Sequence, residues 1–505
     1  MIALSSSILH WARSNPERMA LSYDTDEITY AQLAERTLAT AGALRSQSIR
    51  AGDMVALLMK NSPAFVELTL AISHLGAILL PINYRLGKQE IDYILTHAEA
   101  KLVCVDEELK DNVPETVARV VLSSEQQRDT RLLDPHAEPV KSAHPVTSSD
   151  MFRLMYTSGT TDRPKGVVHS YENFYWKTLD HICELGLTAV DRLLVVGPLY
   201  HVGAFDLPGF AVFLTGGSMT IMRDFDAEQV LDAIEQGRLT GAWLPPVMLN
   251  RLLALKNHGD YDVTSLRWVV GGGERTPTER IVSFSTLFKH GRYIDAYGLT
   301  ETCSGDTMMQ AGQEHLKIGS AGRPLAHVRI EIRDSDGSML PAGHTGEICV
   351  SGPKVTRGYW NDPERTRASF FGLWFRTGDM GYLDDDGFLF LVDRKKDMVI
   401  TGGENVASSE VERVIYSLDK VEEAAVVGLP DEQWGERVVA IVVLREGETL
   451  TLSELQTYCR HKIGGFKIPK QLFVVDVLPR TASGKVLKRE LRERLIHQRQ
   501  ETSSL

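Results

Sequence analysis

Residues 156–166 read Tyr-Thr-Ser-Gly-Thr-Thr-Asp-Arg-Pro-Lys-Gly and lie between two short apolar runs. The apolar runs predict two strands, and the turn between them is dense in hydroxyl groups and contains a glycine and Lys165. Such a turn can direct backbone N–H groups, hydroxyls and one ammonium toward a single anion. An ordinary surface turn would need fewer of these residues. The stretch therefore predicts an anion-binding loop, and it is not a Walker A loop because Gly-x-x-x-x-Gly-Lys-Ser/Thr is absent from it.

The size and charge of the chain limit its architecture and its partners. With 505 residues, the chain is longer than one hydrophobic core usually allows, which predicts two or more domains. Its hydrophobic content of 43% and charged content of 24% are typical of a soluble globular protein. A net charge of -12 argues against a nucleic acid or an anionic membrane as partner. An anionic substrate such as ATP would therefore need a local basic site.

Neither the cysteines nor the N-terminus indicate export or membrane insertion. The five cysteines are scattered without metal-binding or disulfide spacing, which fits a reducing cytoplasm. The first residues lack the basic segment and long apolar core of a signal peptide. The most apolar long stretch, 65–80, contains Glu67 and His74 and is too polar to span a bilayer. We therefore expect a cytoplasmic protein without a transmembrane segment.

The first 300 residues alternate between strand-like and helix-like patterns. Buried strands are expected at 54–59, 77–81 and 102–105, and a helix is expected at 30–46. This βαβ rhythm predicts a parallel sheet with helices on its faces, and a second series of the same kind follows the predicted anion-binding loop. The polar segment 123–150 carries three prolines and is interpreted as a connector rather than a packed element.

The pattern changes after about residue 325. Short strands separated by Gly and Asp turns predict a β subdomain, and mixed helix and strand patterns from residue 394 predict a small α+β domain. The expected fold class is therefore α/β. A large N-terminal domain, 1–393, would hold two βαβ-type sheets and the β subdomain, and a small C-terminal domain would occupy 394–505.

Four more segments carry residues suited to nucleotide chemistry. They read Asp-Ala-Tyr-Gly-Leu-Thr-Glu at 295–301, Arg-Thr-Gly-Asp at 376–379, Asp-Arg-Lys-Lys-Asp at 393–397 and Arg-Thr-Ala-Ser-Gly-Lys at 480–485. Taken alone, each could be an ordinary turn, helix cap or solvated charge run. Together with the loop, and in this order, they resemble the motifs of the AMP-forming adenylating enzymes. That family includes acyl-CoA synthetases, aryl-CoA ligases, luciferases and peptide-synthetase adenylation domains, and the loop departs from its pattern at Asp162, where Gly is usual.

The resemblance implies how a nucleotide would be held. Lys165 would contact the outer phosphates, Tyr297 would stack on one face of adenine, and Asp379 would hold the ribose. Glu301 would be the metal contact, since Mg²⁺ prefers few carboxylates together with phosphate oxygens and water. The implied ATP- and AMP-binding set is Thr157, Ser158, Gly159, Thr160, Thr161, Lys165, Gly272, Gly273, Glu274, Asp295, Ala296, Tyr297, Gly298, Thr300, Asp379, Arg394 and Lys485.

The resemblance also implies a catalytic set and a moving domain. Lys485, on a loop near the C-terminus, would approach the carboxylate and the α-phosphate only while the adenylate forms. Lys396 would be the hinge about which the mobile C-terminal domain rotates. The implied catalytic set is Lys485, Glu301, Thr160 and His201.

Two further sets would hold the acid and coenzyme A. The implied acyl-binding set is His201, Val202, Gly203, Ala204, Phe205, Ala296 and Ser304. These side chains are mainly small and apolar, and none provides a clamp for a second carboxylate. The implied CoA-binding set is Gly402, Gly403, Glu404, Trp434 and Lys470, although Trp434 could simply pack and Lys470 could simply be solvated.

The predicted reaction has two steps and uses ATP, Mg²⁺ and coenzyme A. ATP and a carboxylic acid would give acyl-AMP and pyrophosphate, and the thiol of CoA would then displace AMP. The acid is left open among medium- or long-chain fatty, aryl and alicyclic acids. The expected partners are this acid and CoA, with no nucleic acid, and a homodimer is left open.

Alternatives differ in the acceptor or in the class of protein. The acyl group could be loaded onto a carrier protein instead of CoA. An amino-acid module is disfavoured because Val202 stands where such modules usually carry an Asp for the amine. A regulator that binds ATP or acyl-AMP without turnover is disfavoured by the joint presence of Lys165, Glu301 and Lys485. Luciferase-like oxidation has no signature of its own here.

Overall fold

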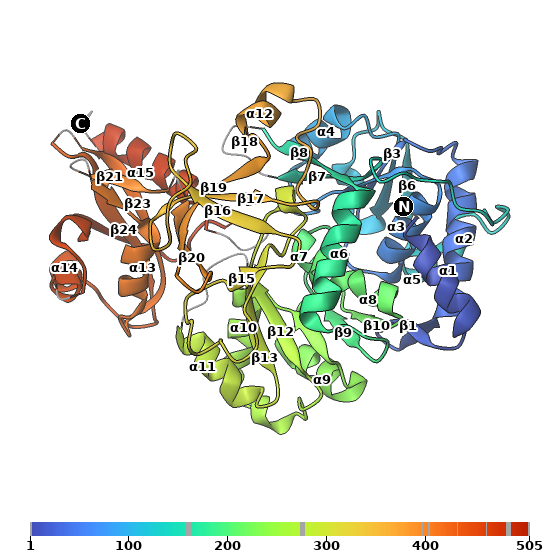
Figure 1. The fold of residues 1–505 in the computed structure, drawn as a ribbon, viewed down its shortest axis with the longest axis horizontal. Helices are drawn as coiled ribbons and strands as arrows, with labels where there is room; N and C mark the ends of the chain where they lie inside the picture. The colour runs from blue at the N-terminus through green and yellow to red at the C-terminus, as the bar shows by residue number, and fades with distance from the viewer. Residues whose placement is uncertain are drawn as a thin grey trace. The chain divides into compact units, whose positions relative to one another are not determined.

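The structure, a computed structural model, describes residues 3–157, 163–272, 278–394, 397–401, 404–431, 433–460, 462–480 and 486–502. The chain divides into two compact units. Figure 1 colours the chain by residue number, from blue at the N-terminus to red at the C-terminus. Unit 1 is Met1–Ile330 with Val350–Phe375, and unit 2 is Glu331–Cys349 with Arg376–Leu505. In the described part of the chain, no helix is both long and apolar enough to cross a membrane.

One sheet of unit 1 carries the two strands that flank the predicted phosphate loop. Its strand order is β6-β5-β3-β4-β7-β8, with all pairs parallel except the antiparallel pair β7–β8. β3 is apolar and buried along its whole length, as a strand covered on both faces must be. The bounds are β3 (Met54–Leu58), α3 (Pro63–His74), β4 (Ile78–Pro81), α4 (Lys88–His97), β5 (Leu102–Asp106), η1 (Glu107–Asn112), β6 (Arg119–Leu122), β7 (Met151–Thr157) and β8 (Lys165–Ser170).

A second sheet of unit 1 has the order β15-β14-β13-β12-β11-β9-β10-β1-β2. Its central strands are β9 (Arg192–Val195), β11 (Gly241–Trp243), β12 (Trp268–Gly272) and β13 (Arg292–Tyr297), and its outer strands are β1 (Met19–Tyr23), β2 (Asp26–Thr29), β10 (Ser218–Ile221), β14 (Thr307–Met308) and β15 (Arg323–Pro324). β9, β10, β11, β12 and β13 are parallel neighbours. The residues Gly272 and Tyr297 end β12 and β13, and ligands of such sheets bind at the carboxyl ends of the strands.

Helices of unit 1 bury these strands. α9 (Ala227–Gly237), α10 (Pro246–Leu253) and α11 (Thr278–Leu287) lie beside the second sheet in Figure 1. Their apolar faces share a core with β12, which includes Val230, Leu249, Phe284 and Val269. The remaining elements are α1 (Ser5–Ser14), α2 (Tyr30–Ser46), α6 (Tyr171–Leu185), α7 (Val202–Ala204), η3 (Phe205–Gly209), α8 (Ala211–Thr215), η4 (His258–Asp260), η5 (Thr300–Thr302), α12 (Pro363–Ala368) and β18 (Phe370–Phe371).

Unit 2 contains short antiparallel strands and a helix-covered sheet. β20 (Leu389–Arg394) pairs with β19 (Trp374–Leu383), and β16 (Arg329–Arg333) and β17 (Gly346–Ser351) continue this sheet. The other sheet has the order β22-β21-β24-β23, with β25 beside β24, and its core includes Val411, Val426 and Leu455. The bounds are β21 (Val399–Thr401), β22 (Glu404–Val406), α13 (Ser408–Tyr416), β23 (Val421–Asp431), β24 (Gly435–Leu444), α14 (Leu452–Arg460), η6 (Gly465–Lys467), β25 (Gln471–Val474) and α15 (Lys488–Thr502).

The predicted α/β class is confirmed, and two local predictions were wrong. The segment 123–150 contains α5 (Ser124–Arg128) and η2 (Thr130–Leu133), and it is partly packed. Thr130 is fully buried, and its backbone N–H donates to Glu67 Oε2 at 3.0 Å. The segment 376–379, for which the sequence pattern predicts a turn before a strand, lies inside β19, and Gly378 takes a positive φ of 72° there. The predicted domain boundary at residue 394 stays a prediction.

Candidate functional site

Lys165 and Glu301 form the centre of the described part of the site. Lys165 begins β8, and its Nζ lies 2.7 Å from Glu301 Oε1. Tyr359 joins the pair: Lys165 donates to its hydroxyl at 2.7 Å, and the hydroxyl donates to Glu301 Oε1 at 3.0 Å. Burial and the adjacent Glu301 carboxylate raise the pKa of Tyr359, so its hydroxyl remains a donor. A buried carboxylate is thus held by one cation and one hydroxyl.

The donor set around Glu301 fits a magnesium ion that arrives with ATP. Among the described residues, no cluster of three His, Cys, Asp or Glu side chains could enclose a metal ion. Mg²⁺ usually takes one or two carboxylates and completes its shell with phosphate oxygens and water. Glu301 supplies one carboxylate beside the lysine predicted to contact phosphate. The residues therefore suit a shared Mg²⁺ better than a permanently bound ion.

Backbone crowding at the ends of β12 and β13 requires glycine. The register pairs Gly271 with Asp295 and Gly272 with Ala296. A Cβ on Gly271 would lie 1.9 Å from the hydroxyl of Tyr293, and one on Gly272 would lie 2.6 Å from the backbone oxygen of Ala296. The predicted nucleotide-binding residues around Gly272 and around Ala296 therefore lie on neighbouring strands of one sheet. Gly273 and Glu274, which belong to the same prediction, lie outside the described residues.

The loop after Glu301 is held by a lysine that the sequence motifs do not include. Lys354 is fully buried, and its Nζ donates to the backbone oxygens of Ser304 and Gly305, both at 2.6 Å. Its Nζ also lies 2.9 Å from Asp306 Oδ1. Ser304, predicted to line the acyl site, is buried with a φ of 68°. The position of Ser304 is thus fixed by an internal cation.

His201 and a neighbouring tryptophan form the aromatic part of the predicted acyl segment. His201 Nδ1 accepts the backbone N–H of Gly203 at 3.0 Å, and its ring stacks on Trp243 at 5.9 Å between ring centroids. A Cβ on Gly203 would lie 2.2 Å from Cζ2 of Trp243. Phe205 is buried, as are Val202, Ala204 and Ala296. Trp243 was missed because a tryptophan at a strand end is usually part of the core.

Unit 2 brings together one pair of predicted nucleotide residues. Asp379 and Arg394 are paired across β19 and β20, and Arg394 Nε lies 3.5 Å from Asp379 Oδ1. Of the predicted CoA contacts, Glu404 and Lys470 are exposed, and Trp434 is half-exposed. The predicted residues Ser158, Gly159, Thr160, Thr161, Lys396, Gly402, Gly403 and Lys485 lie outside the described residues, as does Asp162.

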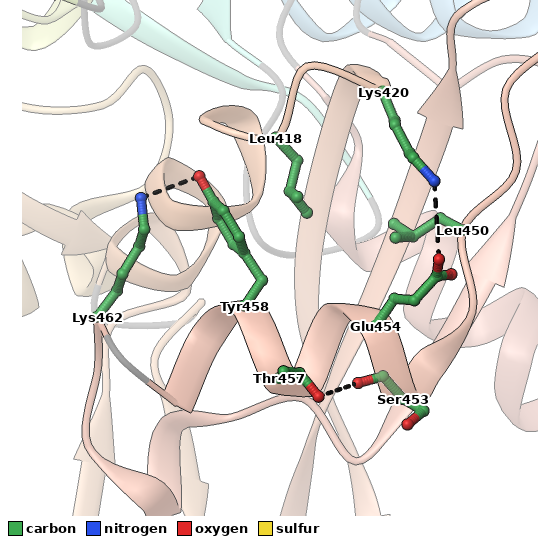
Figure 2. A pocket seen from close by; sticks show the side chains of 8 residues that line it. All are labelled: Leu418, Lys420, Leu450, Ser453, Glu454, Thr457, Tyr458 and Lys462. Carbon is green, nitrogen blue, oxygen red and sulfur yellow. Dashed lines mark hydrogen bonds and ion pairs between the residues drawn. The ribbon is translucent and has the colours of Figure 1, made fainter.

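A surface hollow of about 560 Å³ in unit 2 holds none of the predicted site residues. Figure 2 shows Lys462 beside Tyr458 and Lys420 beside Glu454 along it. Lys462 donates to the Tyr458 hydroxyl at 2.9 Å, and Lys420 Nζ lies 3.7 Å from Glu454 Oε1. Both cations already have partners, so the hollow presents no charge reserved for a ligand.

Two family models cover most of the chain. Residues 8–360 match the AMP-binding enzyme family, and residues 410–485 match the AMP-binding enzyme C-terminal domain. This chain belongs to the AMP-binding enzyme family. The family predicted from the motifs is therefore confirmed, and so is the predicted class, an AMP-forming acid–thiol ligase.

Relatives of this AMP-binding enzyme match it over nearly its whole length. A feruloyl-CoA synthase from Amycolatopsis sp is 36% identical over 489 residues, which cover 96% of this chain and 97% of that protein. The o-succinylbenzoate CoA synthetase from Bacillus subtilis, solved with the acyl-adenylate OSB-AMP, has a TM-score of 0.89 and 32% identity over 96% of this chain and 97% of that one. The structure of the same enzyme with ATP and a magnesium ion has a TM-score of 0.87 and 32% identity, and the match covers 96% of this chain and 98% of that one.

Replacing Tyr359 with Phe tests the centre of the site. The change removes the hydroxyl that bridges Lys165 and Glu301 but keeps the ring. We expect the maximal rate of acid-dependent ATP–pyrophosphate exchange to fall about 10-fold, because one hydrogen bond to a charged group is lost. Tyr382→Phe is the matched control, since this ring stacks on Phe390 in unit 2. An unchanged exchange rate in Tyr359→Phe would contradict this role.

Replacing Gly203 with Ala tests the contact with Trp243. The new methyl group forces the indole to move, so we expect the KM for the preferred acid to rise about 10-fold while the KM for ATP changes less than about 2-fold. The measurement is pyrophosphate exchange at varied acid and varied ATP. Gly259→Ala is the control, because a Cβ there meets nothing within 4 Å. Equal increases in both KM values would argue against an acid-specific role.

Proposed function

We propose that this protein uses ATP to activate an aromatic monocarboxylic acid and transfers the acyl group to coenzyme A, releasing AMP and pyrophosphate. The observation that carries this proposal is the contact of Lys165 with Glu301, 2.7 Å apart. It joins a predicted phosphate contact to a predicted metal contact. The site assignments rest on the motifs and on this geometry.

Two observations favour an aromatic acid, and the buried ion pairs beside the acyl segment favour a single carboxylate. Relatives are named for feruloyl and o-succinylbenzoate substrates, and the stacked rings of His201 and Trp243 offer a flat apolar surface. A second carboxylate would need a cation near the acyl segment. Arg153, which lies beside the Phe205 ring, and Lys177 are both described, and both are already bonded to Asp206. A long fatty chain is less favoured because Trp243 closes the space beside Gly203.

The first step exchanges one bond at the α-phosphorus. An oxygen of the substrate carboxylate attacks this phosphorus, the bond to the pyrophosphate oxygen breaks, and acyl-AMP forms. Lys165 would stabilise the outer phosphates as pyrophosphate leaves, and Lys485 would stabilise the α-phosphate. Mg²⁺, when bound, neutralises charge on phosphate oxygens. Glu301 would hold that ion, and Thr300 would contact the α-phosphate.

The second step forms the thioester. The thiol of CoA attacks the acyl carbon, the bond from that carbon to the AMP oxygen breaks, and the thiol proton leaves to solvent. Lys485 must withdraw before the thiol can approach, which requires the domain from residue 394 to rotate about Lys396. Glu404, Trp434 and Lys470 would then contact CoA, together with Gly402 and Gly403.

The alternatives predict different acceptors or no turnover. Loading of a carrier protein is not favoured, because the relatives described above are named for CoA. A regulator without turnover would not need both a metal contact and a phosphate contact in one buried cluster. A cytoplasmic location and a homodimer remain proposals. The cytoplasm is supported by the cysteines, all five of which are free.

A panel of carboxylic acids tests the proposed function directly. Each acid is assayed with Mg·ATP for pyrophosphate exchange, and then with CoA for thioester and AMP. We expect hydroxycinnamate- and benzoate-type acids to give both activities, and dicarboxylic and long-chain acids to give little. Thioester formation on an added carrier protein but not on CoA would support the first alternative. A failure of exchange with every acid would support the second.

Lys485→Ala should separate the two steps. The lysine is needed only while the adenylate forms, so we expect acid-dependent pyrophosphate exchange to fall about 100-fold, as for loss of one charge contact in a transition state. Conversion of supplied acyl-AMP with CoA should continue at the wild-type rate. Lys470→Ala is the matched lysine control for the exchange assay. Exchange at the wild-type rate in Lys485→Ala would exclude the proposed role.

Lys396→Pro should test the hinge. Proline fixes φ and restricts the preceding residue, so rotation about this position becomes difficult. We expect thioester formation from supplied acyl-AMP to fall more than pyrophosphate exchange does. Lys395→Pro is a neighbouring control for general disruption of the segment. The same loss in both half-reactions of Lys396→Pro would count against a hinge at this residue.

A further inference from the structure

Three charged side chains of unit 1 are buried together beside the predicted acyl segment. They are Arg153 on β7, Lys177 on α6 and Asp206 on η3. Arg153 Nη1 donates to Asp206 Oδ1 at 3.1 Å, Arg153 Nη2 donates to Oδ2, and Lys177 Nζ lies 3.1 Å from Oδ1. The guanidinium carbon also lies 5.6 Å and 5.5 Å from the ring centroids of Phe174 and Phe205. The group is therefore a desolvated ion cluster.

Asp206 supplies the negative charge of this cluster. Burial lowers the pKa of Lys177 to about 8. Burial alone would raise the pKa of Asp206, but Arg153 and Lys177 lower it. Asp206 is therefore the ionised acceptor that both cations share, and it holds the guanidinium of Arg153 in a two-point contact.

The guanidinium sets the tautomer of His169 on β8. Arg153 Nε donates to His169 Nδ1 at 2.8 Å, and a guanidinium has no acceptor. Nδ1 must therefore carry a lone pair, and the ring proton lies on Nε2. Nε2 lies 2.6 Å from the backbone oxygen of Thr300 and donates to it. Burial lowers the pKa of His169 to about 3, so the ring is neutral when it makes both contacts.

This chain of bonds joins two parts of the site that are far apart in sequence. Thr300 precedes Glu301, whose own backbone oxygen accepts from the N–H of Thr356 at 2.7 Å. At the other end, Asp206 follows Phe205 directly, and its backbone oxygen is 2.8 Å from His181 Nδ1. The segment predicted to hold the α-phosphate and the metal is thus fixed relative to the segment predicted to hold the acid.

The stability of the folded protein does not by itself explain why three charged side chains are buried together here. A buried ion pair can often be replaced by apolar residues of similar volume without loss of stability, whereas removal of one partner is costly. The hydrogen bonds instead form one continuous chain. Arg153, which is paired with Asp206, donates to His169, and the neutral ring of His169 donates to the backbone oxygen of Thr300. Such an arrangement specifies where that carbonyl lies.

We propose that His169 is a positioning residue that fixes Thr300 and Glu301 relative to the acyl segment, and that the Arg153–Asp206 pair orients it. The proposal depends on the proposed function only for the roles of Thr300 and Glu301. His169 acts through the backbone of Thr300 and touches neither the acid nor the nucleotide.

Two amide variants distinguish positioning from a general structural role. His169→Gln can reach the Thr300 oxygen with its amide nitrogen, whereas His169→Asn keeps an acceptor for Arg153 but is too short to reach Thr300. The probe is AMP alone, whose phosphate is the α-phosphate, titrated calorimetrically into each full-length protein. Melting temperatures are recorded for all three proteins. Pyrophosphate exchange then gives KM and the maximal rate with the best acid.

The proposal predicts a difference between the two variants. His169→Asn should weaken AMP binding about 10-fold, and His169→Gln should stay within about 3-fold of wild type, because one hydrogen bond is lost in the first and kept in the second. Wild-type AMP affinity in both variants would overturn the proposal. Equal weakening in both variants, in step with equal drops in melting temperature, would also overturn it.

A measurement on the wild-type protein keeps the proposal testable if the variants do not fold. Nitrogen-15 spectra of labelled histidine should show one ring as the neutral Nε2–H tautomer throughout the range from about pH 6 to about pH 8. An Nδ1–H tautomer or an imidazolium at this position would overturn the proposal. AMP binding needs no turnover, so failure of the acid panel and failure of this inference are separate outcomes.

Discussion

Lys165 begins β8 in one sheet of unit 1 and Glu301 follows β13 of the other, yet Lys165 Nζ and Glu301 Oε1 lie 2.7 Å apart. The protein carries a net charge of -12, so a site for ATP cannot depend on overall attraction. Under the proposed function, the pair would supply a cation for phosphate and a carboxylate for metal, and each group now neutralises the other. On binding of Mg·ATP, Lys165 could exchange the Glu301 carboxylate for a phosphate, and Glu301 could exchange the Lys165 ammonium for Mg²⁺.

Close packing around this pair sets the shape of the rest of the site. Gly271 and Gly272 allow β12 and β13 to end against each other, and Lys354 fixes the loop that carries Ser304. Trp243 fills the space that a side chain on Gly203 would need. The small residues of the predicted acyl segment therefore do not leave an open channel. Under the proposed function they would face the ring of an aromatic acid, as in the acids for which the relatives are named.

The sequence motifs predict most of the residues proposed to bind the nucleotide, but few of the residues that hold those residues in place. Lys165 and Glu301 stand in motifs that can be read locally. His169 and Lys354 could not be found in this way, since their roles depend on contacts such as that between His169 and Thr300, 131 residues apart. The segment 123–150 was misjudged for the same reason, because its polar composition hides the contact of Thr130 with the buried Glu67.

Transfer of oxygen from the acid to AMP tests the central claim most directly. A preferred acid labelled with oxygen-18 in its carboxylate is incubated with Mg·ATP and CoA, and the products are analysed by mass spectrometry. Attack of the carboxylate on the α-phosphorus followed by thiolysis at the acyl carbon leaves one labelled oxygen in AMP. Unlabelled AMP, or label in inorganic phosphate with ADP as the nucleotide product, would contradict an adenylate intermediate.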